Sequence, residues 1–81
     1  MARPSPRYAG DPVLISIGQA IRELRAELGL SQETLAYEAG VDRSYMGGVE
    51  RGQHNLSAIT LARICKCLGV SMWELMRRAD V

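Results

Sequence analysis

The chain has 81 residues, of which 47% are hydrophobic and 23% are charged, and its formal net charge is +1. This length has room for one hydrophobic core, and the composition is that of a folded globular domain. No apolar run approaches the ~20 residues that cross a bilayer, and no continuous apolar stretch follows the basic N-terminus as in a secretory signal. We therefore expect a cytoplasmic protein without a membrane partner.

The chain offers little from which to build a metal site or an active site. Cys65 and Cys67 are two residues apart, so on a helix they point to nearly opposite faces and suit neither a disulfide nor a shared metal ion. His54 is the only histidine, and no phosphate-binding Gly-rich motif occurs. We predict no enzyme activity, no metal, no cofactor and no small-molecule ligand.

The first fourteen residues differ in character from the rest of the chain. They contain all three prolines, show no helical periodicity and carry Arg3 and Arg7 against Asp11. We predict a flexible N-terminal arm over 1–14 and a single domain over 15–81. The arginines of the arm could reach a DNA backbone or minor groove, or the arm could be a disordered leader.

The domain divides into short segments of helical periodicity separated by glycine-containing turns. The first is expected to begin at a capping box of Ser16 and Gln19 and to end at Gly29. Four more helices are predicted from their caps and stop signals: Gln32 to Ala39, Arg43 to Arg51, Ser57 to Leu68, and from Ser71 onward. The expected fold is an all-α bundle of five helices.

A tight turn, Gly40-Val41-Asp42, joins the second and third of these helices. Its glycine stands where a left-handed backbone is needed, and Val41 can pack between the two helices. This arrangement is typical of a helix-turn-helix, whose second helix can lie in the DNA major groove. The same pattern also occurs in helical hairpins that only build a core.

The stretch from Gly29 to Gly52, GLSQETLAYEAGVDRSYMGGVERG, resembles the phage-repressor and Cro-type (xenobiotic-response-element) helix-turn-helix family. Asn55 to Leu75 resembles the fourth and fifth helices of that family. Asp-Arg-Ser-Tyr followed by Glu-Arg-Gly is most similar to the controller proteins of restriction–modification systems. The resemblance implies a compact lambda-repressor-like bundle that binds double-stranded DNA and regulates transcription. It also implies a homodimer on a palindromic operator, with 43–51 in the major groove.

An alternative is a protein-interaction module of the same fold, such as an antitoxin or an adaptor. From Ile15 onward the chain has eight basic and eight acidic residues, so the domain itself is neutral. A neutral domain can bind a polyanion only through the distribution of its charges.

The resemblance implies roles for individual residues. Base contacts are predicted for Arg43, Ser44, Tyr45 and Gly48, and phosphate contacts for Gln32, Arg51, Gln53, His54 and Asn55. An arginine can donate to guanine O6 and N7 at once, whereas a serine discriminates less. Three residues have ordinary alternatives: Gln32 as a solvated first-turn residue, Tyr45 as a packing residue and His54 as an exposed residue without a contact.

Two further sets of residues are singled out. The resemblance pairs Glu50 with Arg25 as a structural ion pair, which would neutralise a carboxylate close to DNA. The last helix carries more apolar surface than the bundle needs, and a dimer interface is predicted for Val70, Met72, Trp73 and Met76. Alternatively, Trp73 covers the core of its own monomer.

The glycines at 47 and 48 depart from the family pattern. Each costs about 1 kcal/mol relative to alanine inside a helix. They leave fewer side chains to read bases, which would shift specificity onto Arg43 and the shape of the DNA.

Overall fold

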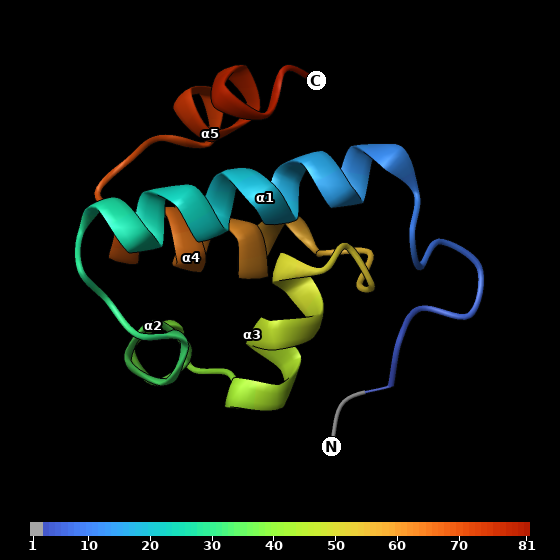
Figure 1. Ribbon diagram of the computed structural model, residues 1–81, viewed down its shortest axis with the longest axis horizontal. Helices are drawn as coiled ribbons and strands as arrows, with labels where there is room; N and C mark the ends of the chain where they lie inside the picture. The colour runs from blue at the N-terminus through green and yellow to red at the C-terminus, as the bar shows by residue number, and fades with distance from the viewer. Residues whose placement is uncertain (1–2) are drawn as a thin grey trace.

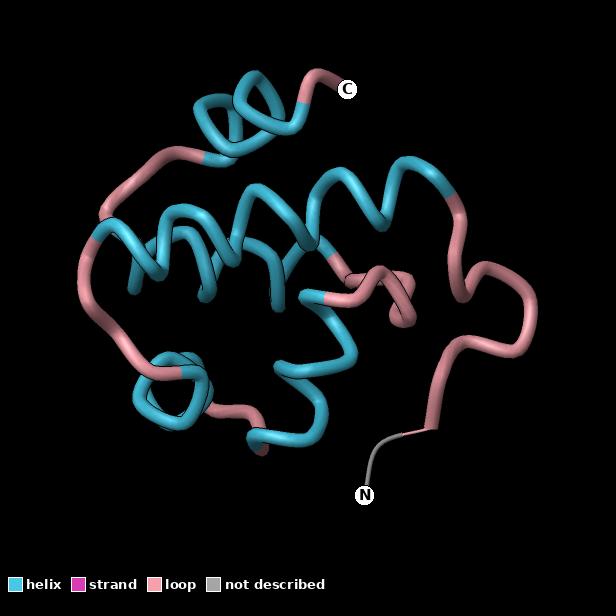
Figure 2. Tube along the Cα trace, viewed as in Figure 1, coloured by secondary structure: helices cyan, strands magenta, loops and turns pink. Residues whose placement is uncertain are grey.

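The computed structural model describes residues 3–81, which form five α-helices connected by loops (Figures 1 and 2). The helices are α1 (Pro12–Glu27), α2 (Gln32–Ala39), α3 (Arg43–Glu50), α4 (Ala58–Leu68) and α5 (Met72–Ala79). No strand occurs within the described range. The predicted all-α class and the five-helix bundle are confirmed.

Four of the five helices begin at the caps predicted from the sequence, Ser31, Asp42, Ser57 and Ser71. In each case the side-chain oxygen accepts a hydrogen bond from the backbone N–H three residues further on. Such a bond satisfies a donor that the helix itself leaves without a partner. At Ser71 the capping box is complete, because Glu74 also accepts from the Ser71 N–H at 3.0 Å.

The predicted start of the first helix is wrong. Helix α1 begins at Pro12, behind Asp11, whose carboxylate accepts from the Val13 N–H at 2.9 Å. Proline suits this position because a first-turn N–H would have no partner in the helix. The expected capping box at Ser16 therefore lies inside the helix, and the arm ends at residue 11 instead of 14. The flexibility of the arm stays a prediction, and its residues 1–2 lie outside the described range.

Helix α1 crosses the middle of the molecule, with α5 on one side and α3 on the other (Figure 1). Helix α2 packs against α3 and α4, and α4 also contacts α5. The largest fully buried side chains come from all five helices: Ile21, Leu35, Met46, Val49, Ile64 and Leu75. Val41, in the turn after α2, packs against this core as predicted. Helix α3 is thus held by its inner face, which leaves its opposite face for other contacts.

Gly18 allows α1 to approach the end of α3 closely. A Cβ at this position would lie 2.7 Å from the carbonyl oxygen of Glu50, so a side chain would push the two helices apart.

Cys65 is buried, Cys67 is half-buried, and both are free thiols. None of the helices formed by residues 3–81 has the length and hydropathy to span a membrane.

Candidate nucleic-acid interface

The turn between α2 and α3 holds the two helices in a helix-turn-helix arrangement. Gly40 ends α2 in the left-handed conformation, with φ 77° and ψ 28°, where glycine is favoured. The Val41 N–H then donates to the Ala36 carbonyl at 2.9 Å, and the Asp42 carboxylate accepts from the Tyr45 N–H at 2.7 Å. These local bonds set the direction in which α3 leaves the turn.

The first turn of α3 presents polar side chains to solvent. Arg43 and Ser44 are exposed, while Met46 and Val49 on the inner face are buried in the core. Arg43 makes no ion pair or side-chain hydrogen bond with residues 3–81. Its guanidinium group is therefore available to donate to a base edge or to a phosphate.

Gly47 and Gly48 are buried beneath side chains that follow the helix. A Cβ on Gly47 would lie 3.1 Å from Nη1 of Arg51, and one on Gly48 would lie 2.5 Å from Nε2 of His54. The two glycines thus make room for Arg51 and His54 to fold back over α3. The imidazole ring therefore occupies the space beside Gly48, and the base contact predicted at Gly48 stays a prediction.

His54 is a packed residue, only 8% exposed, so the alternative of an exposed residue is wrong, whereas its phosphate contact stays a prediction. Its ring stacks on that of Tyr45, with centroids 4.4 Å apart and an interplanar angle of 23°. Burial lowers the pKa of His54, and the positive charge of Arg51 lowers this pKa further. The negative charge of Asp42 raises the pKa in part. The imidazole is therefore neutral at pH 7, and it supports Tyr45. Burial also raises the pKa of the Tyr45 hydroxyl, which keeps its proton and can donate.

Glu50 joins three helices through one carboxylate. Its side chain is buried and accepts from Arg25 Nε at 2.7 Å and from Arg25 Nη2 at 3.1 Å. The side-chain amide of Gln32, at the start of α2, also donates to Glu50, at 2.9 Å. The hydrogen bond to Glu50 raises the pKa of Arg25, although burial opposes the rise. The Arg25 Nη1 donates to the Leu30 carbonyl at 2.8 Å, so the guanidinium is held at both ends.

The other residues predicted to contact phosphate all follow the C-terminal end of α3. Arg51 and Asn55 are exposed, Gln53 is half-buried, and Arg51 donates to the side chain of Gln53 at 3.3 Å. The link from Gln32 to Glu50 was missed, because no spacing in the sequence indicates it. The position of Arg51 over Gly47 is weakly indicated by the sequence. Arg51 follows Gly47 by four residues, about one turn of helix, so the two lie on the same face.

The predicted dimer residues lie on and just before α5. Trp73 is 68% exposed and Met72 is 41% exposed, whereas Val70 and Met76 are half-buried and pack against the core. The Arg77 guanidinium lies over the Trp73 ring, 5.4 Å from its centroid. The alternative in which Trp73 covers the core of its own monomer is therefore wrong.

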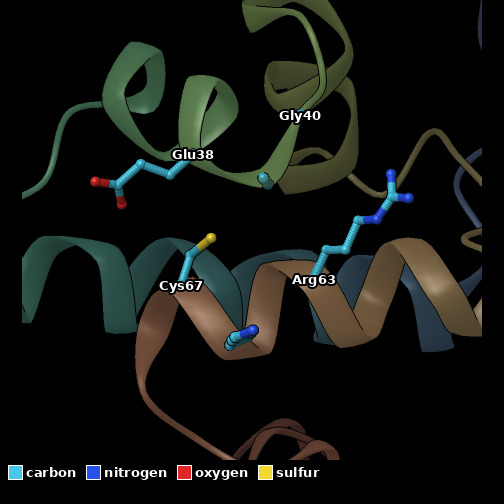
Figure 3. A pocket seen from close by; sticks show the side chains of 6 residues that line it. Glu38, Gly40, Arg63 and Cys67 are labelled. Carbon is cyan, nitrogen blue, oxygen red and sulfur yellow. The ribbon is translucent and has the colours of Figure 1, made fainter.

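A second surface feature lies away from these residues. A cleft of about 500 Å³ separates the C-terminal end of α2 from α4, and Cys67 points into it from α4 (Figure 3). Its walls carry charges of both signs, Glu38 against Arg63 and Lys66. Burial, with the nearby Glu38 charge, raises the pKa of the Cys67 thiol, which stays protonated. Within residues 3–81 no three His, Cys, Asp or Glu side chains are grouped to hold a metal ion.

Comparison with known proteins places this geometry in a family. Residues 21–75 match the model of the helix-turn-helix family. Among curated proteins, a helix-turn-helix transcriptional regulator of Sinorhizobium fredii is 38% identical over 64 residues, covering 79% of this chain and 83% of the relative. The control protein C.BamHI of Bacillus amyloliquefaciens is 35% identical over 65 residues, covering 79% of this chain and 80% of the relative.

Solved structures agree with the sequence matches. The restriction–modification controller protein C.AhdI of Aeromonas hydrophila superimposes with a TM-score of 0.74 at 52% identity, covering 76% of this chain and 94% of that one. The clp gene regulator ClgR of Corynebacterium glutamicum superimposes with a TM-score of 0.81 at 31% identity, covering 84% and 88%. The family consists of regulators rather than enzymes. The chain therefore belongs to the helix-turn-helix family of DNA-binding transcriptional regulators.

Proposed function

We propose that this protein binds a palindromic operator as a homodimer and reads it with the first turn of α3 in the major groove. The observation that carries the proposal is the exposed guanidinium of Arg43, which has no partner among residues 3–81 and stands on a helix whose inner face is anchored in the core. A side chain placed in this way can donate two hydrogen bonds to guanine without first giving up a partner in the protein.

Arg43 is proposed as the main source of sequence discrimination. Gly47 and Gly48 contribute no side chains, and Arg51 and His54 occupy the space beside them. Ser44 has one short hydroxyl, which leaves Tyr45 as the other side chain able to reach a thymine methyl or a phosphate. The stack on His54 restricts the Tyr45 ring, so a contact made by its hydroxyl would cost less conformational entropy.

Phosphate contacts are proposed on both flanks of α3. Gln32 stands at the start of α2, where free backbone N–H groups favour an anion, and its side chain is oriented by Glu50. Arg51, Gln53 and Asn55 follow α3 on the other flank. Because Arg25 neutralises Glu50, the buried carboxylate does not repel the DNA.

The dimer is proposed to form through α5 together with Val70, two residues before this helix. Trp73 and Met72 expose apolar surface that the monomer does not use. Two-fold dimers of helix-turn-helix proteins place their reading helices about 34 Å apart, one turn of DNA. Similarity to control proteins such as C.BamHI supports a controller of restriction–modification genes in particular.

Selection from random double-stranded DNA by the purified protein, followed by sequencing, tests the proposal without a known operator. We expect a two-fold symmetric motif with half-sites about ten base pairs apart, and we expect to find it upstream of the gene for this protein or of a neighbouring restriction gene. A single unpaired half-site would contradict the dimer. Absence of any enriched sequence at low and moderate salt would favour the protein-interaction module.

A further inference from the structure

The N-terminal arm is attached to the loop that follows the reading helix. The Ser5 N–H donates to the Gln53 carbonyl at 2.7 Å, and the Gly10 N–H donates to the Gly52 carbonyl at 2.8 Å. Between these bonds the chain turns back on itself, because the Ser5 side chain accepts from the Tyr8 N–H. In Figure 1 the arm descends from the start of α1 along the side of the molecule on which α3 lies.

The attached arm forms one wall of a groove beside α3. The groove has a volume of about 430 Å³ and is lined by Arg3, Pro4, Ser5, Pro6, Tyr45, His54 and Asn55. The lining groups that can donate hydrogen bonds include the Arg3 guanidinium, the Tyr45 hydroxyl and the Asn55 amide. No carboxylate is among the lining residues, so the only full charge on the walls is positive.

We propose that this groove holds a segment of the DNA sugar–phosphate backbone, with Arg3 and Asn55 donating to its phosphate oxygens. The inference rests on the proposed function, because a helix in the major groove has a phosphate backbone on each side. Tyr45 belongs to both the helix and the groove, so the backbone next to the bases that α3 reads passes directly beside the arm.

The structure of the arm explains how a short segment can bind a phosphate. Pro4 and Pro6 have restricted backbone angles, and the Ser5 N–H between them is bonded to the loop. Arg3 therefore lies two residues from an attachment point on the loop, behind a proline with restricted angles, which lowers the entropy cost of the contact. A contact of this kind adds affinity for every DNA sequence alike.

The first test compares two arginines of the same arm. Arg3→Ala removes a lining cation, whereas Arg7→Ala removes the same charge from an exposed residue outside the groove. Fluorescence anisotropy with the selected operator and with a random duplex measures affinity from 50 to 200 mM salt. Over this range one phosphate contact weakens binding by about 3.5-fold through counterion release. Arg3→Ala should remove the salt dependence due to one phosphate contact on both duplexes. Arg7→Ala should reduce the salt dependence clearly less. Equal losses from the two variants would overturn the inference.

The second test changes the attachment without changing charge. Ser5→Pro removes the N–H that donates to Gln53, while Ser5→Ala keeps it, and both remove the hydroxyl. We expect Ser5→Pro to reduce the salt dependence as Arg3→Ala does, and Ser5→Ala to leave it near that of the unaltered protein. Identical behaviour of the two Ser5 variants would overturn the inference. Circular dichroism should show the same helix content in all four variants.

The outcomes separate this inference from the proposed function. An unaltered protein that binds no duplex refutes both. An unaltered protein that binds its operator, with Arg3→Ala indistinguishable from it, refutes only the arm contact. Tighter binding after Arg3→Ala or after deletion of residues 3–10 would mean that the arm covers the DNA-binding face, which also overturns the inference.

Discussion

Glu50→Gln should destabilise the fold before it alters DNA recognition. The substitution keeps the size of the side chain but removes the charge that pairs with Arg25 at 2.7 Å. Removing one partner of a buried ion pair costs about 3–5 kcal/mol. Here the cost should be smaller, about 2 kcal/mol, because Arg25 keeps its bond to the Leu30 carbonyl and its side chain is 17% exposed.

For a domain of this size, about 2 kcal/mol corresponds to a decrease of about 8–16 °C in Tm. Thermal unfolding, monitored by circular dichroism, measures this decrease in Tm. The matched control is Glu27→Gln, because Arg78 also donates two hydrogen bonds to Glu27, from Nη1 at 2.6 Å and from Nη2 at 3.1 Å, but on the surface. Solvent and salt screen that pair, so its loss should change Tm little.

Two results would refute this reasoning. If Glu50→Gln and Glu27→Gln lower Tm equally, burial does not distinguish the two ion pairs. If Glu50→Gln leaves Tm within about 4 °C of the unaltered protein, corresponding to less than about 1 kcal/mol, the pair contributes little. Arg25→Met provides a second check from the other side. It leaves the more deeply buried charge without its partner and should lower Tm more than Glu50→Gln does.

Four other substitutions test the interface. Arg43→Ala should remove the preference for one base pair in each half-site, about 1–3 kcal/mol of discrimination. Competition binding measures this preference. An equal loss of affinity for operator and random DNA would make Arg43 a phosphate contact. Trp73→Ala should weaken self-association and operator binding together with helix content unchanged, and sedimentation showing the unaltered protein monomeric at tens of micromolar would contradict the dimer. His54 has a lowered folded pKa, so its contribution to stability is complete above the unfolded value near 6.5 and is lost as pH falls below it. His54→Gln should therefore reduce the fall in Tm between pH 7.5 and 5.5, and an unchanged fall would contradict this assignment. Gly48→Ala should lower Tm although alanine favours helix by about 1 kcal/mol, because its Cβ would displace the His54 ring; a higher Tm would show that the ring moves freely.

The features that depend on neighbouring residues could be predicted from the sequence. Ser31, Asp42, Ser57 and Ser71 start their helices where predicted, because a cap bonds to an N–H only three residues away. The turn at Gly40 follows from the same local chemistry, since glycine readily adopts the left-handed conformation that ends α2. The first helix was harder to place because two start signals compete within a few residues, and Asp11 with Pro12 prevails over Ser16.

The contacts of the side chains around α3 depend on how the helices pack and could not be predicted from the sequence. Glu50 accepts from Arg25 and Gln32, which are 25 and 18 residues away, and no pattern along the chain indicates the second bond. Likewise, His54 packs on Tyr45 and covers Gly48 because the chain reverses after α3. Periodicity shows which face of a helix is apolar, but it does not show which distant groups come to lie over the other face. Those positions depend on how the helices pack and on where each connecting loop returns, so they are set by contacts between residues far apart in the chain.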